Sequence, residues 1–340
     1  MKRLIGVLLT LCLALTACTG AAPEEKQYTA TFLTLFDTVT TILGRAESQE
    51  AFSETAQEIH DELLEYHQLF DIYNDYEGLN NLKTINDNAG LAPVQVDSRI
   101  LDLLEDCKAY SELTGGRVNV ALGRVLALWH TAREDGINAP QSAYLPDEAA
   151  LKEAAKHCSL DGVILDREAS TVYLADPELR LDVGAVAKGW SAQRVAESAP
   201  RGLLISVGGN VCATGTKDDQ GTAWVVGVQN PDGGEQYLHT LAITSGSVVT
   251  SGDYQRAYMV DGKLYHHIID PDTLYPGTYW RSVTIVCQDS GLADALSTAL
   301  FLLPREEGQK LLEKAGAEAL WVDAQGQLYY SPGFETLIRT

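Results

Sequence analysis

Residues 182–298 decide how this chain is interpreted, because they carry four polar segments that are punctuated by glycine. In chain order these are Asp182-Val-Gly-Ala-Val-Ala-Lys188-Gly189, Ser206-Val-Gly-Gly-Asn210, Thr250-Ser-Gly-Asp-Tyr254 with His266-His-Ile-Ile-Asp-Pro271, and Ala293-Asp-Ala-Leu-Ser-Thr298. A hydrophobic core alone does not require such segments. Each one alone is more often a tight turn than a ligand contact, so their combination and order carry the information.

The last segment lies in an apolar run and predicts a pair of metal ligands. Residues 292–303 are apolar on all sides, which predicts a buried helix. Asp294 and Thr298 are four apart, so both side chains project from one helix face. A carboxylate on an apolar helix is costly unless it is paired or binds a cation, although it can also cap a local turn. Oxygen ligands with room for water and phosphate suit Mg²⁺ rather than zinc.

The first two segments predict close contact between backbone and ligand. Gly184 permits a tight approach at the start of a helix, and Lys188 can place its ammonium beside a phosphate. The alternative for Lys188 is an ordinary solvated lysine. Gly208 and Gly209 end a predicted strand, where the backbone can face a planar or phosphorylated ligand.

Taken in this order, the four segments resemble the ApbE family of flavin transferases, which are FAD:protein FMN transferases. The resemblance covers most of the chain beyond the leader. It implies an α+β fold of the ApbE type, in which two interlocked α/β subdomains form one compact catalytic unit over residues 28–340. It also implies that FAD is the substrate and that Mg²⁺ is required.

The residues and the resemblance together give a set of expected site residues. The resemblance implies that the Mg²⁺ ligands are Asp294, Thr298 and the backbone carbonyl of Ala185. The expected FAD contacts are Phe36, Tyr73, Asn119, Asp182, Lys188, Gly208, Gly209, Thr250, Ser251, Gly252, His267 and Ile268. Lys188, Asp294 and His267 are expected to take part in catalysis.

His267 is the predicted group that accepts a proton or orients the phosphate, since imidazole titrates in a useful pH range. Adjacent residues on a strand face opposite ways, so only one of His266 and His267 can point into the site. Asp253 and Asp270 remain alternative bases. After Asp270-Pro-Asp-Thr273 this chain continues with Leu274-Tyr-Pro-Gly277, whereas many relatives have a glycine immediately at that point.

Asn119 also departs from the pattern of the family. It replaces a carboxylate that many relatives carry. Its amide can still bond a ribityl or adenine group, but capping of a helix is an equal alternative.

The N-terminus predicts export and a lipid anchor. Lys2 and Arg3 precede the short apolar run 4–15, which is the order of a secretory signal peptide. The sequence Leu15-Thr-Ala-Cys18 resembles a bacterial lipobox. We therefore expect residues 1–17 to be a signal peptide and residues 18–27 to be a tether lipidated at Cys18, which attaches the protein to the extracytoplasmic face of the cell membrane. An ordinary signal peptide with an incidental Cys18 is the alternative.

Charge and cysteine content restrict the class of partner. The formal net charge of −22 argues against nucleic-acid binding. It also means that a pyrophosphate ligand needs a local positive centre. No CxxC spacing signals a zinc or redox site. Beyond Cys18, the apolar surroundings of Cys107, Cys212 and Cys287 predict buried thiols. Disulfide pairing among these three and Cys158 is left open.

Periodicity predicts a mixture of helices and strands without a repeated unit. The predicted helices are 48–70, 98–114 (capped by Ser98), 119–133, 147–158, 186–198 and 292–303. The predicted strands are 32–43, 162–165, 171–174, 202–207, 223–229, 239–245, 257–260 and 282–288. Residues 74–93 are rich in turn-forming residues. No GxGxxG or Walker pattern is present, which removes the usual grounds for a Rossmann or P-loop domain.

The expected activity is Mg²⁺-dependent transfer of the FMN moiety of FAD to a threonine hydroxyl of an acceptor protein, with release of AMP. The acceptor is expected to be a membrane redox subunit or an exported flavoprotein. Two alternatives remain open at this point. One is a Mg²⁺-dependent FAD pyrophosphatase that yields FMN and AMP, and the other is a non-enzymatic flavin-binding lipoprotein.

Overall fold

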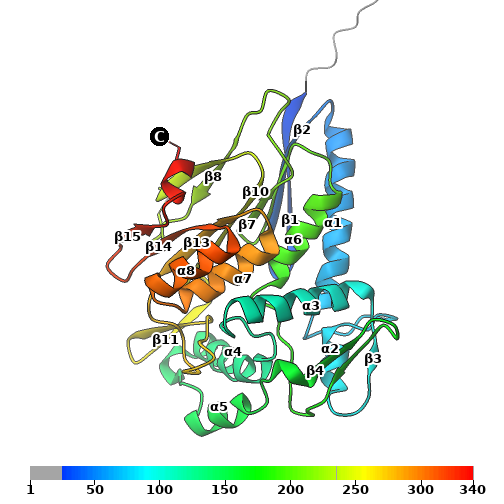
Figure 1. Ribbon diagram of the computed structural model, residues 1–340, viewed down its shortest axis with the longest axis vertical. Coiled ribbons are helices and arrows are strands. Elements are labelled where there is room, and N and C mark those ends of the chain that lie inside the picture. Colours follow the sequence, from blue (N-terminus) through cyan, green and yellow to red (C-terminus); the bar gives the residue numbers. More distant parts are fainter. Residues whose placement is uncertain (1–24, 235, 340) are drawn as a thin grey trace, which may run out of the picture.

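A computed structural model describes residues 25–234 and 236–339 of the chain. Its central element is an eight-stranded sheet in which all neighbouring strands run antiparallel (Figure 1). In spatial order the strands are β1 (Lys26–Leu35), β2 (Thr38–Ala46), β6 (Leu203–Val207), β7 (Asn210–Ala213), β10 (Gly246–Gly252), β13 (Ser282–Cys287), β14 (Glu318–Val322) and β15 (Leu328–Tyr330).

Apolar side chains on the central strands alternate between two hydrophobic layers, as expected for a sheet covered on both faces. On β6, Leu204 packs in the layer that contains the hairpin of β8 (Trp224–Val228) and β9 (His239–Ile243). Ile205 packs in the opposite layer. Val248 and Val249 on β10 divide in the same way.

Helices cover the layer of Ile205, with one helix for each pair of strands. α1 (Gln49–Phe70) contacts β1 and β2, α6 (Ala187–Ser198) contacts β6 and β7, and α7 (Ser290–Phe301) contacts β10 and β13. α8 (Arg305–Ala315) follows beside α7. Within the described residues, no helix has the length and apolar character needed to cross a lipid bilayer.

The chain between α1 and α6 forms a second unit below the sheet in Figure 1. Its elements are α2 (Leu82–Asp87), β3 (Val94–Gln95), α3 (Ser98–Leu113), α4 (Gly123–Asn138), η1 (Pro140–Ser142), α5 (Glu148–Ala155), η2 (Leu160–Gly162), β4 (Val163–Asp166) and β5 (Thr171–Leu174). The hairpin of β11 (Ala257–Val260) and β12 (Lys263–His266) returns to this unit and packs against α4. A short helix, η3 (Phe334–Leu337), lies near the C-terminus. The interlocked α+β fold is therefore confirmed.

The predicted strand 32–43 is wrong as a single element, because the chain reverses within it. β1 and β2 form a hairpin whose turn is Phe36-Asp37, and both residues have a φ of 52°. Left-handed backbone at a two-residue turn matches the twist of antiparallel strands. β1 also includes the last two residues of the predicted tether, since Lys26 and Gln27 pair with β2.

Other predicted boundaries also need correction. The helix predicted at 98–114 is capped by Asp97, whose carboxylate accepts a hydrogen bond from the backbone of Arg99, and not by Ser98. The helix predicted at 119–133 begins only at Gly123. Several elements were not predicted; they are α2, β3, β7, β10, β12, α8, β14 and β15. All of them except α8 are too short for apolar periodicity to identify them reliably.

Candidate active site

A cavity of about 830 Å³ lies between the helix-covered face of the sheet and the second unit. Most of the predicted site residues line it: Phe36, Tyr73, Asn119, Asp182, Ala185, Lys188, Gly208, Thr250, Ser251, His267, Ile268, Asp294 and Thr298. Gly209 and Gly252 do not. Gly209 lies in the β6–β7 turn with a φ of 91°, and Gly252 packs against the ring of Tyr254. The fold therefore gathers segments from both halves of the chain at one place.

Asp294 is the most deeply buried acidic residue of the predicted site, at 4% exposed. Its Oδ2 atom accepts a hydrogen bond from the backbone nitrogen of Gly189 (2.9 Å) and lies 3.7 Å from Nζ of Lys188. Burial raises the pKa of Asp294, although the Lys188 ammonium acts in the opposite direction. A carboxylate in these surroundings favours an additional cation.

The groups around Asp294 fit the predicted Mg²⁺. Thr298 lies one helical turn further along α7, and Ala185 lies just before α6; both line the cavity. One carboxylate, one hydroxyl and one backbone carbonyl make an all-oxygen donor set of the kind that Mg²⁺ prefers, with water and phosphate completing the coordination. Across residues 25–234 and 236–339, no three His, Cys, Asp or Glu side chains gather as a metal cluster. The predicted ligand set contains only one such residue.

Asp182 closes the turn that leads into α6. Its Oδ1 atom accepts a hydrogen bond from the backbone nitrogen of Gly184 at 2.8 Å. Burial raises its pKa, while the hydrogen bond from Gly184 and the charges of Arg256 and Arg133 act in the opposite direction. The turn brings the Gly184 backbone and the Lys188 side chain to the cavity together, and Nζ of Lys188 lies 3.3 Å from the Gly184 carbonyl oxygen.

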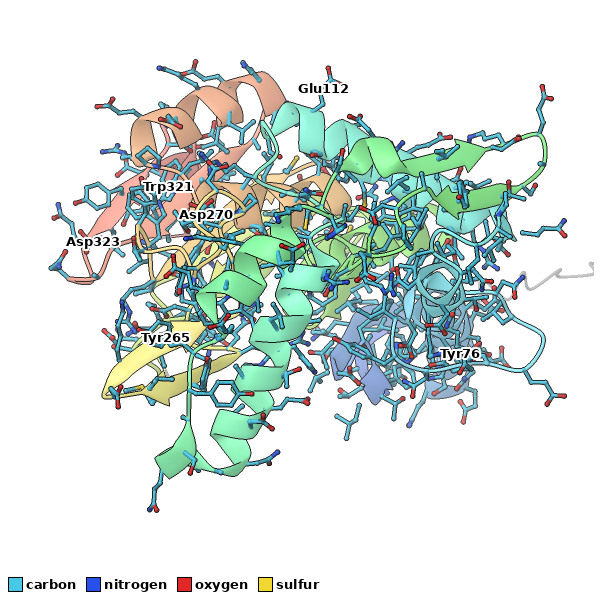
Figure 2. The ribbon with its side chains drawn as sticks, turned by 90° about the horizontal axis from the view of Figure 1, so that it is seen from below. Tyr76, Glu112, Tyr265, Asp270, Trp321 and Asp323 are labelled. Carbon is cyan, nitrogen blue, oxygen red and sulfur yellow. The ribbon has the colours of Figure 1, made fainter. Side chains whose placement is uncertain are left out.

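Two arginines complete the positive centre that a pyrophosphate ligand needs and that the sequence did not locate. Arg133 and Arg256 line the cavity together with Lys188, whereas Arg117 lines it but is paired with Asp270 and Asp272. Burial lowers the pKa of Arg133, and the nearby charge of Arg256 adds to this effect. Arg133 lies on α4 and Arg256 just before β11, so only the packing of that hairpin on α4 brings them near one another. Figure 2 shows Tyr265, which belongs to the same hairpin, beside α4.

The two adjacent histidines differ in their surroundings. His266 is 7% exposed; its Nε2 donates to the Gly277 carbonyl oxygen (2.8 Å), and its ring meets the edge of Phe301. His267 instead lines the cavity, and its Nδ1 is buried without a hydrogen-bond partner among the described residues. Burial lowers the pKa of His267 to about 3, with Arg256, His266 and Lys188 contributing. The expectation that this ring titrates near neutral pH is therefore wrong for the ligand-free protein.

Several of the polar residues that were predicted to contact FAD form hydrogen bonds with other residues of the protein. Asn119 accepts a hydrogen bond from the backbone of Ala121 (2.9 Å) and donates to the Cys158 carbonyl oxygen (2.9 Å), so its amide stabilises the turn before α4. Thr250 bonds the hydroxyl of Thr284 on β13. The hydroxyl of Ser251 lies 2.7 Å from that of Ser297 on α7. Asn119 does not cap α4, whose N-cap is Leu122, and its contact with a ligand stays a prediction because it also lines the cavity.

The β1–β2 turn forms one edge of the cavity. The backbone nitrogen of Phe36 donates to Nδ1 of His67 at 3.2 Å, and the two rings meet edge to face. A methyl group at Gly208 would lie 2.8 Å from the side chain of Thr38. Glycine at position 208 therefore lets the β6–β7 turn lie close to Thr38 at the start of β2.

The sequence profile of the ApbE family matches residues 34–321. The chain belongs to the ApbE family. It is 34% identical to an FAD:protein FMN transferase of Treponema pallidum, over 98% of this chain and 95% of that protein. It is also 34% identical to an FAD:protein FMN transferase of Klebsiella pneumoniae, over 77% of this chain and 83% of that protein.

Solved structures of ApbE proteins share the fold. The ApbE protein of Thermotoga maritima superposes with a TM-score of 0.81 at 29% identity, covering 93% of this chain and all of that one. The flavin transferase ApbE from Vibrio cholerae superposes with a TM-score of 0.74 over 92% of this chain and all of that one. At 21% identity, the latter similarity concerns the fold alone.

The ApbE fold of this chain places both alternative bases outside the lining of the cavity. Asp253 pairs with Arg281 at 3.6 Å. Asp270, labelled in Figure 2, pairs with Arg117 at 2.9 Å. His267 therefore remains the predicted base that lines the cavity.

The cysteines Cys107, Cys158, Cys212 and Cys287 are free thiols in the part of the chain that the structure describes.

Proposed function

We propose that this protein is an FAD:protein FMN transferase that moves the FMN moiety of FAD to a threonine hydroxyl of an acceptor protein and releases AMP. The observation that carries the proposal is the buried Asp294 at the wall of a cavity that also exposes Lys188, Arg133 and Arg256. Such a site suits a pyrophosphate and a divalent cation. The two relatives at 34% identity are FAD:protein FMN transferases, which supports the same activity.

The size of the cavity supports a large ligand. About 830 Å³ lies near the upper end of the range for small-molecule sites, as a dinucleotide requires. The wall combines apolar and aromatic groups, among them Phe36, Tyr73 and Ile268, with the basic groups near α6. The proposed arrangement places the pyrophosphate near Lys188 and the flavin against the apolar wall.

Asp294, Thr298 and the carbonyl of Ala185 would hold the Mg²⁺ ion. When bound, the ion would neutralise charge on the pyrophosphate as the bond to AMP breaks. Lys188 adds a positive charge 3.7 Å from the same carboxylate, and the hydrogen bond from Gly189 fixes the direction of that carboxylate. With the ion bound, these residues would orient the phosphorus for attack by the threonine oxygen.

The proposed transfer replaces the phosphoanhydride bond between FMN and AMP with a phosphoester bond between FMN and threonine. The threonine oxygen forms a bond to the phosphorus on the FMN side, the bond to the AMP oxygen breaks, and AMP carries away the electron pair. The threonine proton goes to His267 or to water. The neutral ring of His267 can accept a proton, and bound phosphate charges would raise its pKa from the low value of the ligand-free protein.

Mass spectrometry of a threonine-containing acceptor protein, incubated with FAD and Mg²⁺, tests the proposal. The expected product has the acceptor mass plus FMN less one water, and AMP appears in equal amount. AMP and free FMN in the presence of acceptor, without any acceptor product, would instead identify a pyrophosphatase. FAD binding without AMP release would identify a flavin-binding protein.

Asp289→Asn is a matched control for Asp294→Asn in this assay. Asp289 is the N-cap residue of the same helix, α7, and its carboxylate accepts a hydrogen bond from the backbone nitrogen of Leu292. The side-chain oxygen of asparagine can accept the same hydrogen bond. It does not line the cavity. We expect transfer to be retained in Asp289→Asn and lost in Asp294→Asn.

The proposed location is the extracytoplasmic face of the cell membrane. Its basis is the leader sequence, with Cys18 as the lipidated residue. Residues 1–17 and Cys18 lie outside the residues that the structure describes. The acceptor is proposed to be a membrane redox subunit or another exported flavoprotein, because a tethered enzyme meets such proteins.

A further inference from the structure

Asp71 lines the cavity, yet both of its carboxylate oxygens are engaged by a single turn. Oδ1 accepts hydrogen bonds from the backbone nitrogens of Tyr73 (2.6 Å) and Asn74 (3.1 Å). Oδ2 accepts from the side-chain amide of Asn74 (2.9 Å) and from the hydroxyl of Tyr76 (2.8 Å). Asp71 is only 8% exposed. A carboxylate with four donors in place has little capacity left for a ligand.

Asp71 stays charged near neutral pH. Burial acts to raise its pKa, but the hydrogen bonds from Asn74, Tyr73 and Tyr76 outweigh burial, and the pKa lies below the usual range. Charge-assisted hydrogen bonds are stronger than neutral ones. The turn at residues 71–76 is therefore held firmly where α1 ends.

A second polar residue supports the turn from the side of α2. The side-chain amide of Asn81 donates to the backbone oxygens of Asn74 (2.9 Å) and Gln68 (3.2 Å). Asn81 is fully buried and also caps α2. Figure 2 shows Tyr76, the outermost member of the network, in the loop that follows α1. The turn is thus fixed at both ends.

This network holds an aromatic ring in an exposed position. Tyr73 is 57% exposed although it lines the cavity, and its ring centre lies 5.5 Å from that of His130 on α4. An exposed aromatic ring on a rigid turn offers a preorganised face to a planar ligand. Asp71, Ile72 and Asn74 of the same turn also line the cavity, but Tyr73 is the only aromatic residue of the turn at 71–76 that does so.

We propose that Asp71 is a positioning residue that acts through Tyr73, by holding that ring at the cavity so that the planar ring of the substrate can pack against it. The identity of that ring as the isoalloxazine of FAD rests on the proposed function. Asp71 itself does not contact the substrate. Its loss should therefore weaken binding of FAD while the steps of transfer around Asp294 proceed.

A double-mutant cycle of Asp71→Ala and Tyr73→Leu tests the proposal, with FAD affinity measured directly by quenching of flavin fluorescence. We expect Asp71→Ala alone to weaken FAD binding about tenfold, and to have no further effect when Tyr73 is already leucine. The KM for FAD should rise while kcat changes little. Equal weakening by Asp71→Ala in both backgrounds, or no weakening at all, would overturn the proposal.

Two conservative variants keep the test decisive if Asp71→Ala folds poorly. Asp71→Asn retains an oxygen that can accept from the backbone of Tyr73 and Asn74, so FAD affinity should lie between those of wild type and Asp71→Ala. Tyr76→Phe removes one hydrogen bond at the far end of the network and should change affinity by about twofold or less. A larger loss in Tyr76→Phe than in Asp71→Asn contradicts the proposal. Absence of AMP release by the wild type would overturn the proposed function but would leave the binding results for Asp71 standing.

Discussion

The backbone nitrogen of Gly189 donates a hydrogen bond of 2.9 Å to Oδ2 of Asp294, which joins helices α6 and α7 at the buried carboxylate. Only glycine permits this approach. A methyl group at position 189 would lie 2.5 Å from Cβ of Asp294 and would overlap the backbone oxygen of Ser290. Gly189 of the first sequence segment and Asp294 of the last are therefore packed directly against each other.

Gly189→Ala should separate the two helices at this point. We expect the free energy of unfolding to fall by about 1–3 kcal/mol, the usual cost of overpacking, with a loss of AMP release because Asp294 is displaced. Urea denaturation and the AMP assay measure the two effects. Gly308→Ala on α8, where the nearest atom would be 3.3 Å away, should change stability by about 1 kcal/mol or less. Equal effects of the two variants would show that the close approach is not critical.

Asp294→Asn keeps the size of the side chain and removes its charge. Because the folded-state pKa of Asp294 is raised, its charged form destabilises the metal-free fold, so we expect the variant to unfold at the same temperature as wild type or higher without Mg²⁺. Added Mg²⁺ should raise the melting temperature of wild type only, and Mg²⁺-dependent AMP release should be lost. Unchanged activity at saturating FAD would disprove the metal assignment.

His267→Ala and His266→Ala should fail in different ways. Removing His267 should lower turnover by about two orders of magnitude, the usual effect of losing an acid–base group, with little change in FAD affinity. Removing the buried His266 breaks its bond to Gly277 and its contact with Phe301, so the unfolding free energy should fall by about 2–4 kcal/mol. Denaturation and single-turnover assays separate the two. A stable His266→Ala variant with the larger loss of turnover would mean that the base has been misassigned.

The pH dependence of kcat/KM tests the state of His267. Its pKa of about 3 in the ligand-free protein leaves the ring neutral over the physiological range. Since kcat/KM reports the free enzyme, this residue should produce no acid limb near pH 6.5. Any acid limb should persist in His267→Ala. An acid limb near 6.5 that disappears in the variant would contradict the buried, neutral ring.

Stability against pH gives an independent check of the same residue. The unfolded chain, with an ordinary histidine pKa of 6.5, takes up a proton before the folded state does. The contribution of His267 to stability should therefore be lost as pH falls from 6.5 towards 3. His267→Ala should lose less stability over this range than wild type, and identical pH profiles would count against the lowered pKa.

Cys18→Ser tests the proposed anchor. If Cys18 is lipidated, the variant should leave the membrane fraction and should keep full activity on a soluble acceptor. Fractionation followed by the AMP assay measures both. Persistent membrane attachment would point to an uncleaved apolar leader instead.

Much of the site follows from the sequence because each motif contains residues whose presence needs a reason. A carboxylate in the apolar run of α7 and a lysine after a glycine turn are informative alone, and both reach the same cavity. Arg133 and Arg256 gave no such signal. They resemble any other surface arginine until the β11–β12 hairpin is packed on α4.

The errors in secondary structure have equally specific causes. The turn at Phe36-Asp37 contains neither glycine nor asparagine, so nothing in its composition predicts a left-handed backbone. The amide of Asn119 is satisfied by Ala121 and Cys158, and the second of these lies on a distant part of the chain. Contacts of this kind depend on tertiary packing, which local patterns do not record.

The residues that line the cavity extend along the chain from Phe36 to Thr298. During synthesis, the helix that carries Asp294 therefore emerges after nearly all other parts of the wall. A nascent chain that ends before α7 can pair β1 with β2 and β6 with β7, but it has no carboxylate for the cation. Binding of the cation at the proposed site should therefore require that the chain has been synthesised through α7.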